Sequence, residues 1–341
     1  MATRVAVIGA GSWGTALAAR VLNHNFDRVT LWSRREEVAQ EINGERCNSK
    51  YLPGIKIPQN VVATSSLEAA ATDQDLLVFS TPSAHLRGVL QQVAPLLQKP
   101  IDIVNTAKGF EPNTLQRLSE VIKEELGSNA RSIGVLSGPN HAEEVGLDMP
   151  AASVVSSTDE EAVSRLQDAF FTPNFRVYTN HDIVGVELGG ALKNIIALAA
   201  GVADGMGFGD NTKAMLITRG LGEMVRLGLV LGADLRTFAG LSGIGDLIAT
   251  CTSKHSRNWN AGYKIGQGQK LQQVAGGTHM VIEGVFATQA AYKISRKLEV
   301  EMPLTEALQR VLFHDDDPRI TLVEMMNRVR KHEYEDLEFG I

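Results

Sequence analysis

Lys193 is the side chain whose surroundings point most clearly to chemistry. It lies beside Asn194 in the segment 187–197, ELGGALKNIIA, where most other residues are apolar or small. A lysine that is partly desolvated and has cations nearby has a lowered pKa, so it can exchange a proton with an alcohol or carbonyl oxygen near neutral pH. The alternative is a lysine whose stem covers apolar surface while its ammonium reaches solvent.

The same segment also carries a narrow stripe of small side chains on one face of a predicted helix. Gly190, Asn194, Ala197 and Gly201 recur at helical spacing. Such a stripe predicts that another backbone or a cofactor approaches the helix closely.

The stretch 253–258, SKHSRN, gathers groups that suit a phosphate monoester. Arg257 offers a charged fork of donors, and Ser256 and Asn258 offer neutral donors just before a predicted helix. Asp246 ends the glycine-rich turn that precedes this stretch. The alternative for these residues is an ordinary helix N-cap beside a surface arginine.

Two further polar clusters follow predicted strands in the first half of the chain. Lys108 lies in NTAKGF, residues 105–110, and Gly138 and Asn140 lie in LSGPNHAE, residues 136–143. Ligands of open α/β sheets bind outside the carboxyl ends of the strands, which is where both clusters fall. Lys108 alternatively extends to solvent along its stem, and His141 fits a turn residue better than a catalyst.

A dinucleotide-binding motif follows the first predicted strand. Gly9, Gly11 and Gly14 form a G-x-G-x-x-G that opens into the predicted helix 15–22. The first glycine permits a tight turn, the second lets backbone approach a pyrophosphate, and the third lets helix and strand pack closely. The helix N-terminus offers N–H groups to the phosphates. A glycine-rich turn without a ligand is the alternative.

The residues after the second predicted strand favour NADP(H) over NAD(H). An NAD site carries Asp or Glu about 20 residues beyond the glycines, whereas this chain has Ser33, Arg34 and Arg35. Guanidinium groups pair with a 2′-phosphate in bidentate geometry. Surface arginines are the alternative, and Glu36 and Glu37 fit the start of a helix better than ribose ligands.

The elements that carry these residues predict an α/β fold with an N-terminal Rossmann-type doubly wound sheet and a C-terminal all-α domain. β-branched runs alternate with helical periodicity in the first half, and helical segments dominate after about residue 182. We expect an NAD(P)-binding domain over 1–181 and a helical substrate-binding domain over 182–341. The strands are expected at 5–8, 29–32, 75–80, 101–106, 132–136, 152–155 and 175–178, and the later helices at 186–202, 213–229, 285–298, 304–312 and 321–336.

Composition narrows the class of protein further. The 341 residues are 44% hydrophobic and 21% charged, as in ordinary globular proteins. A formal charge of -6 argues against a nucleic-acid partner held by counterion release. Cys47 and Cys251 have no zinc-ligand spacing, so we expect free thiols and no metal. With no evident leader and no run of 18 apolar residues, we expect no integral membrane segment and a cytoplasmic location.

Taken in chain order, these motifs resemble the bacterial NAD(P)-dependent glycerol-3-phosphate dehydrogenase family. The resemblance covers essentially the whole chain. The motifs that carry it are GAGSWG at 9–14, TAKG at 106–109, LSGP at 136–139, ELGGALKN at 187–194, GIGDL at 243–247 and SRN at 256–258.

The resemblance implies reversible hydride transfer from NADP(H) or NAD(H) to dihydroxyacetone phosphate, giving sn-glycerol 3-phosphate for phospholipid synthesis. Lys193 is implied as the proton donor, and Lys108 as a contact to cofactor and substrate. The remaining substrate residues implied are Gly138, Asn140, Asp246, Ser256, Arg257 and Asn258. The remaining cofactor residues are Gly9, Gly11, Ser12, Trp13, Gly14, Arg34, Arg35, Ala142, Val281 and Glu283, with Arg257 reaching the cofactor as well.

Two other functions remain open from the residues. A related dehydrogenase of hydroxy acids or sugar acids would prefer a carboxylate substrate, and a non-catalytic NADP-binding sensor would bind the dinucleotide without turnover. Lys193, Asp246 and Arg257 together argue against the sensor, because binding alone does not require a buried lysine. We expect a homodimer from the apolar helical half.

Overall fold

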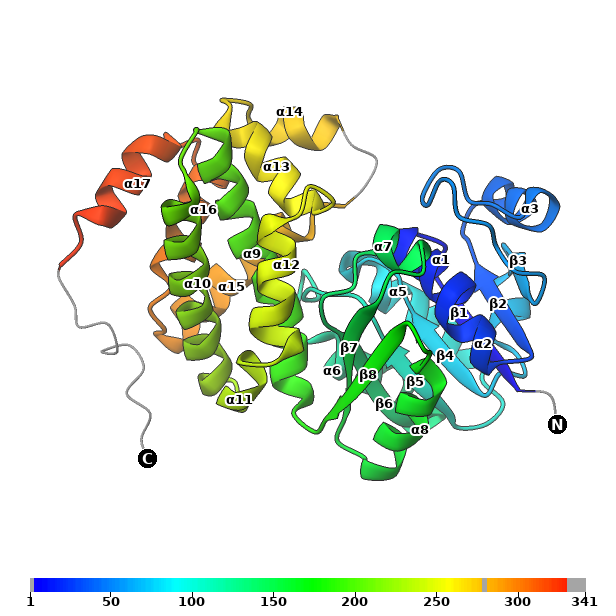
Figure 1. Ribbon diagram of the computed structural model, residues 1–341. Coiled ribbons are helices and arrows are strands. Elements are labelled where there is room, and N and C mark those ends of the chain that lie inside the picture. The colour runs from blue at the N-terminus through cyan, green and yellow to red at the C-terminus, as the bar shows by residue number, and fades with distance from the viewer. Residues whose placement is uncertain (1–2, 278–280, 330–341) are drawn as a thin grey trace. The chain divides into compact units, whose positions relative to one another are not determined.

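The computed structural model describes residues 3–277 and 281–329 (Figure 1). The chain divides into two compact units, residues 1–186 and 187–341. The first unit is built on an eight-stranded sheet in the order β3-β2-β1-β4-β5-β6-β7-β8. All neighbouring strands are parallel except β6 and β7. The predicted α/β fold with a doubly wound sheet is confirmed. The strands are β1 (Arg4–Ile8), β2 (Arg28–Trp32), β3 (Val61–Thr64), β4 (Leu76–Phe79), β5 (Ile101–Asn105), β6 (Ala130–Ser137), β7 (Ala151–Ser157) and β8 (Phe175–Asn180).

Apolar side chains lie on both faces of the sheet because helices cover both faces. In β1, Val5 and Val7 join one buried cluster, while Ala6 and Ile8 join the other. Successive strand residues point to opposite faces, so a strand covered on both sides must be apolar throughout. The helices of this unit are α1 (Ser12–Ala16), which continues through the π-helical turn η1 (Leu17–Leu22) into α2 (Asn23–Asn25), then α3 (Glu36–Glu45), α4 (Leu67–Ala71), α5 (Ser83–Val93), α6 (Leu118–Leu126), α7 (Ala142–Gly146) and α8 (Glu160–Phe170), with short 3-10 turns η2 (Ala94–Leu96) and η3 (Gly127–Asn129).

Strand β3 is an element that the sequence did not predict. Its four residues form the edge of the sheet, and half of them are only partly buried. Such a short, half-covered strand lacks the continuous apolar run of the central strands. Helix α6 begins at Leu118, after Leu115, whose left-handed φ of 62° no helix interior accommodates.

Asp102 on β5 is the buried carboxylate of the first unit's sheet. Its side chain is 6% exposed and accepts hydrogen bonds from Arg131 Nε at 2.9 Å and Ser132 Oγ at 2.6 Å, with Arg165 also within reach. Burial acts to raise the pKa of Asp102, but the hydrogen bonds from these partners outweigh burial and lower the pKa to about 2.

We expect Asp102→Asn to lower the free energy of unfolding by about 2 kcal/mol at pH 7. Because the folded pKa lies below the unfolded value, this contribution is complete above pH ~4 and is lost as the pH falls toward about 2. Urea unfolding at pH 7 and pH 3 measures the difference between variant and wild type. The exposed Asp168→Asn is the control, and a difference for Asp102→Asn that does not shrink at pH 3 would contradict this account.

All regular secondary structure in the described part of the second unit is helical, as predicted. A long buried helix, α9, begins at Ile183 and is surrounded by the others (Figure 1). By length and composition α9 could cross a membrane, but 94% of its apolar window is buried, as in the core helix of a globular protein. The helices are α9 (Ile183–Gly205), α10 (Asp210–Val230), α11 (Leu235–Phe238), the π-helical turn η4 (Leu241–Gly245), α12 (Asp246–Thr252), α13 (Arg257–Gly266), α14 (Leu271–Gly276), α15 (Glu283–Leu298), α16 (Pro303–Phe313) and α17 (Pro318–Met326).

The side chain of Glu223 on α10 caps the N-terminus of α16, although the two helices are far apart in the sequence. Its carboxylate accepts hydrogen bonds from the backbone N–H groups of Leu304 and Thr305 and from the Thr305 hydroxyl. Burial raises the pKa of Glu223, and these donors oppose the rise. The last helix, α17, ends at Met326, short of the predicted 321–336, and residues 330–336 of that prediction lie outside the described residues.

Candidate functional site

The glycine motif forms the turn between β1 and α1. Gly9 has a φ of +131°, and a Cβ there would lie 2.6 Å from the backbone oxygen of Ser80. A Cβ on Gly14 would lie 1.9 Å from the Gly9 oxygen, so this residue lets the helix pack onto the turn. A Cβ on Gly11 would meet no atom within 4 Å. Neither packing within the protein nor a positive φ therefore requires glycine at position 11.

The N-terminus of α1 is suited to an anion. Gly11 is its N-cap and makes no side-chain cap, and the first turn carries no acidic residue. The leading N–H groups therefore lack the side-chain acceptor that usually satisfies them. Ser12 and Trp13 also contact the surrounding fold: Ser12 Oγ donates to the Tyr51 carbonyl at 2.6 Å, and the Trp13 ring packs 6.2 Å from that of Phe175.

The residues after β2 present their guanidinium groups at the surface. Ser33 is buried and its hydroxyl accepts a hydrogen bond from the backbone N–H of Arg35 at 3.2 Å. Arg34 is exposed and Arg35 half-buried, and within residues 3–277 and 281–329 neither side chain has a hydrogen-bonding partner. Glu36 and Glu37 open α3, as predicted.

Lys108 reaches across the carboxyl ends of β5 and β6. Its Nζ donates to the Gly138 carbonyl at 2.9 Å and to Asn140 Oδ1 at 3.0 Å. Asn140 Nδ2 donates in turn to Ser153 Oγ at 2.8 Å, which fixes the orientation of the amide. Gly138 has a φ of +140°, and a Cβ there would lie 2.9 Å from Ser153 Cα. The structure thus brings together three of the predicted residues of the first unit.

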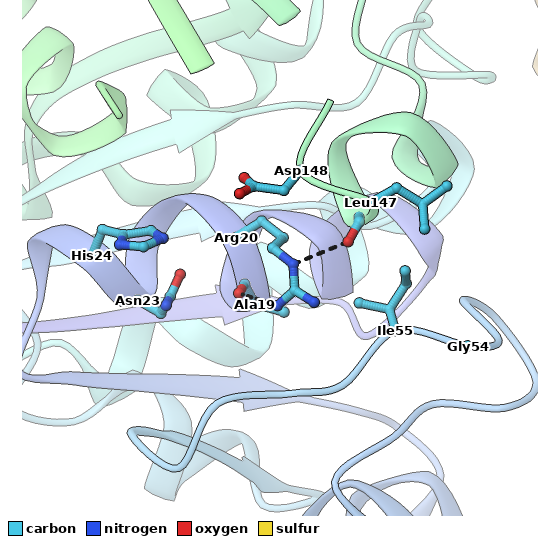
Figure 2. Close-up of a pocket in the computed structure, with 9 residues that line it drawn as sticks. Ala19, Arg20, Asn23, His24, Gly54, Ile55, Leu147 and Asp148 are labelled. Atoms are coloured by element: carbon cyan, nitrogen blue, oxygen red, sulfur yellow. Dashed lines mark hydrogen bonds between the residues drawn. The ribbon is translucent and has the colours of Figure 1, made fainter. Parts of the chain in front are cut away.

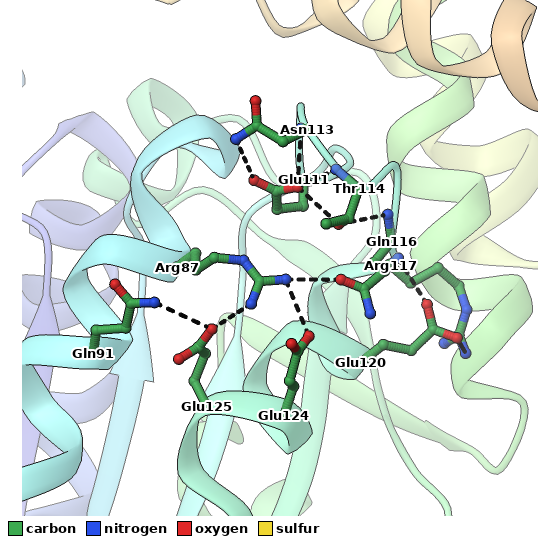
Figure 3. Close-up of polar contacts among 10 residues, drawn as sticks. All are labelled: Arg87, Gln91, Glu111, Asn113, Thr114, Gln116, Arg117, Glu120, Glu124 and Glu125. Atoms are coloured by element: carbon green, nitrogen blue, oxygen red, sulfur yellow. Dashed lines mark hydrogen bonds and ion pairs between the residues drawn. The ribbon is translucent and has the colours of Figure 1, made fainter.

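The loop that carries Lys108 is held by a network of polar contacts (Figure 3). The buried Glu111 accepts hydrogen bonds from the backbone N–H groups of Asn113 and Thr114, at 2.9 and 2.5 Å. Burial acts to raise the pKa of Glu111, but these donors lower it below its usual value. Arg87 on α5 binds Gln116 at the end of the loop and pairs with the carboxylates of Glu124 and Glu125 on α6.

Lys193 is buried on α9 and forms an ion pair with Asp246, the first residue of α12. Lys193 is 5% exposed and Asp246 2%. Lys193 Nζ also donates to Thr250 Oγ1 at 2.8 Å, one turn further along α12. Cations were predicted near this lysine, but its partner in the second unit is a carboxylate. The pair offsets the desolvation of each charge and holds the ammonium in one place.

The N-terminus of α13 carries the predicted phosphate-binding residues together. Ser256 is the N-cap and its hydroxyl accepts from the backbone N–H of Trp259 at 3.2 Å. Arg257 is exposed, with Nη1 3.5 Å from the Val281 carbonyl, and Asn258 is buried. The alternative raised from the sequence, that this stretch is a helix N-cap, is correct for Ser256. The cap fixes the first turn of α13, in which Arg257 lies.

Asn258 links α13 to α9 and α15. Its Nδ2 donates to Asn194 Oδ1 at 2.8 Å, and its Oδ1 accepts from the backbone N–H of Gly284 at 2.9 Å. Gly284 follows Glu283 at the start of α15, and Val281 lies just before that helix. Ala142, the remaining predicted cofactor residue, opens α7 and is buried.

Asn194 and Thr250 belong to these clusters although the sequence analysis assigned neither to the site. Asn194 stood out as an amide in an apolar helix, next to the lysine. Thr250 gave no signal, because its role depends on its lying one helical turn beyond Asp246.

Two models of one protein family match most of the chain. A family model described as the NAD-dependent glycerol-3-phosphate dehydrogenase N-terminus matches residues 4–163, and one described as the C-terminus matches residues 182–323. The chain belongs to this family.

Relatives and solved structures agree over almost the full length. A glycerol-3-phosphate dehydrogenase (NAD(P)+) of Geobacillus kaustophilus is 53% identical over 334 residues, covering 98% of this chain and 97% of the relative. Another from Bacillus licheniformis is 51% identical over 337 residues, covering 98% and 97%. The crystal structure of glycerol-3-phosphate dehydrogenase from Coxiella burnetii has a TM-score of 0.91 at 36% identity and covers 96% of this chain and 99% of that one.

A surface pocket of this glycerol-3-phosphate dehydrogenase family member lies apart from the residues that the sequence singled out (Figure 2). Arg20 is committed to the fold there, since Nε donates to the Gly146 carbonyl and Nη1 to the Lys56 carbonyl, each at 3.0 Å. The pocket also contains the exposed carboxylate of Asp148. Its lining residues are Ala19, Arg20, Asn23, His24, Gly54, Ile55, Gly146, Leu147 and Asp148.

Both cysteines are free thiols, Cys251 buried and Cys47 half-buried, as predicted. Burial raises the pKa of Cys251 to about 12, so this thiol is protonated at neutral pH. Cys47 lies near Glu41 and Glu45, with the potential ligand atoms within 4.8 Å of one another. Burial and the hydrogen bond to Glu41 also raise the pKa of Cys47, and no geometry here demands a metal.

Proposed function

We propose that this protein is an oxidoreductase that uses NADPH or NADH to reduce dihydroxyacetone phosphate, reversibly, to sn-glycerol 3-phosphate. The buried ion pair of Lys193 and Asp246 is the observation that carries the proposal. The chain is also 53% identical over 334 residues to a relative named glycerol-3-phosphate dehydrogenase. Burying a lysine and a carboxylate costs desolvation free energy, so such a pair points to a functional role for the lysine's proton.

The first unit supplies the residues proposed for the cofactor, and we assign residues 1–181 to an NAD(P)-binding domain. The bare N-terminus of α1 and the open space at Gly11 fit a pyrophosphate. Arg34 and Arg35 fit a 2′-phosphate, which favours NADP(H), and Ser12, Trp13 and Ala142 complete this set by resemblance. When bound, the cofactor supplies the hydride that the protein's own side chains cannot.

The second unit supplies the residues proposed for the substrate, and we assign residues 182–341 to a substrate-binding domain. Arg257 offers its guanidinium to the phosphate group, and Ser256 and Asn258 hold the same helical turn. Val281 and Glu283 lie at the start of α15, which Asn258 fixes through Gly284. Arg257, Val281 and Glu283 are also proposed to reach the cofactor.

The proton is assigned to Lys193 Nζ. As the C2 carbonyl is reduced, its oxygen gains negative charge and takes a proton from the ammonium; in the oxidation, the neutral amine takes the proton back. Asp246 and Thr250 hold Nζ in position for this transfer. Lys108, whose Nζ is oriented by Gly138 and Asn140, is proposed to stabilise the developing charge on the oxygen.

We further propose a cytoplasmic homodimer that supplies sn-glycerol 3-phosphate to phospholipid synthesis and binds no nucleic acid. Burial of α9 within the protein supports the absence of a membrane-spanning segment. On α17, Ile320, Val323 and Met326 are 61%, 59% and 64% exposed and suit contact with a second copy. Light scattering during size exclusion tests this state, and a monomer at every concentration would contradict it.

Gly11→Ala is expected to weaken cofactor binding about tenfold or more while leaving the stability of the protein unchanged. A Cβ at this position meets nothing in the protein, so only an approaching pyrophosphate would clash with it. Fluorescence titration with NADPH measures the affinity, and thermal unfolding without cofactor measures the stability.

Gly14→Ala is the contrasting variant for this test. Its Cβ would lie 1.9 Å from the Gly9 oxygen, so it should lower the melting temperature even without cofactor. Unchanged NADPH affinity in Gly11→Ala would place the pyrophosphate elsewhere.

The proposed function is tested by the stereochemistry of the reverse reaction. The protein should reduce NADP+ with sn-glycerol 3-phosphate and be nearly inactive with its enantiomer, since the residues proposed to hold the phosphate and the reacting oxygen are fixed in one helical unit. Equal rates with both enantiomers, or no reaction with either, would contradict the proposed substrate.

A further inference from the structure

One polar cluster in the second unit has no part in the chemistry proposed above. Asp204, near the end of α9, accepts a hydrogen bond from the Trp259 indole Nε1 at 2.7 Å, and the same carboxylate oxygen forms an ion pair with Lys213 Nζ at 2.9 Å. The side chains of Asp204 and Lys213 are 13% and 21% exposed. This cluster therefore ties α9, α10 and α13 together at a largely buried point.

The contact between α9 and α13 is made by backbone rather than by interlocking side chains. A Cβ on Gly201 would lie 2.1 Å from the Trp259 oxygen, and one on Gly262 would lie 2.0 Å from the Leu198 oxygen. The stripe predicted from the sequence is thus covered, at Gly201, by another backbone. Smooth faces set the distance between two helices but offer no ridges to fix their rotation or sliding.

Polar bonds at the edges of this contact supply that restraint. One is the hydrogen bond from Asn258 at the start of α13 to Asn194 on α9, and the other is the hydrogen bond from Trp259 to Asp204. The Trp259 ring also stacks on Tyr263, with centroids 5.1 Å apart, so the indole is held on its own helix.

Trp259 lies in the first turn of α13, which is the turn that carries Arg257. The backbone N–H of Trp259 donates to the N-cap hydroxyl of Ser256, so the anchor and the cap belong to one rigid turn. A restraint on the indole is therefore a restraint on the position of the Arg257 backbone.

We propose that Asp204 is a positioning residue for the substrate phosphate: it holds Trp259, and through it the turn that presents Ser256, Arg257 and Asn258. The inference rests on the proposed function. Lys213 neutralises the carboxylate, which keeps a negative charge near the phosphate-binding turn from opposing the binding of an anion.

The test compares two substrates in the full-length protein. Trp259→Phe and Asp204→Ala should each raise the KM for dihydroxyacetone phosphate about threefold to tenfold, the effect of one lost hydrogen bond, with kcat and the KM for NADPH within about twofold of wild type. With unphosphorylated dihydroxyacetone, kcat/KM should not change, because no phosphate is present to be misplaced.

Two further variants show whether Asp204 affects the KM through its hydrogen bond to the Trp259 indole. Asp204→Asn keeps an acceptor for Trp259 and should restore the KM to near the wild-type value, and the double variant of Asp204→Ala with Trp259→Phe should be no worse than either single variant. The exposed Asp168→Asn is the charge-matched control.

Several results would overturn the inference. One is an unchanged KM for dihydroxyacetone phosphate in folded Trp259→Phe or Asp204→Ala; another is an equal loss of kcat/KM with both substrates, which would indicate general disruption. A KM in Asp204→Asn as high as in Asp204→Ala would also overturn it. A wild-type protein that reduces both substrates equally would contradict the proposed function itself, and this is seen without any variant.

Discussion

Lys193→Ala should lower kcat about 10²- to 10⁴-fold, the usual contribution of a positioned proton donor. The KM for NADPH should stay near wild type, because the proposed cofactor residues lie mainly in the other unit. Stopped-flow and steady-state oxidation of NADPH with dihydroxyacetone phosphate measure both effects.

Removal of Lys193 leaves Asp246 buried without its cation, which is expected to cost about 3–5 kcal/mol of stability. Melting temperature and NADPH binding must therefore be recorded beside the rates. If the single variant unfolds, Lys193→Ala combined with Asp246→Asn removes the uncompensated charge. Lys297→Ala, on the exposed side of α15, is the matched control. Near wild-type turnover in a folded variant would show that another group moves the proton.

Arg257→Ala should raise the KM for dihydroxyacetone phosphate about tenfold to hundredfold, since a hydrogen bond to a charged group contributes about 1.5–3 kcal/mol. The exposed guanidinium lies in the first turn of α13 and is the charged donor of the proposed phosphate site. A change in KM that exceeds the change in kcat would indicate lost binding in the ground state.

Unphosphorylated dihydroxyacetone separates this role from a structural one. Its kcat/KM should be almost the same in Arg257→Ala and wild type, because the lost donor has no phosphate to meet. Arg296→Ala, an exposed arginine on α15, controls for the loss of one positive charge. An unchanged KM for dihydroxyacetone phosphate would remove Arg257 from the phosphate site.

Local sequence patterns were sufficient to predict the central strands of the sheet and the order of the two units, first α/β and then helical. β1, β4 and β5 are buried on both faces and consist mostly of apolar residues, so their runs stand out against the helical segments between them. β3 was missed because an edge strand buries less and therefore carries a weaker pattern. Short helices such as α11 and α14 were missed for a similar reason, since too few turns are available to show a periodicity.

The candidate site was predictable where a residue type is unusual for its position. A lysine in an apolar helix and glycines after a strand are visible without a structure. Partners brought together from distant segments are not, as Lys193 with Asp246 or Asp204 with Trp259 show. That Lys193 is paired with a carboxylate rather than surrounded by cations could not be predicted, because the pairing depends on how α12 packs on α9.

The central claim is tested most directly by the initial rate of NADPH oxidation with dihydroxyacetone phosphate, measured beside NADH and beside unphosphorylated dihydroxyacetone. We predict rapid oxidation that depends on the phosphate group and is faster with NADPH than with NADH. No oxidation by a folded protein that binds NADPH would contradict the account and favour a hydroxy-acid dehydrogenase or a dinucleotide sensor.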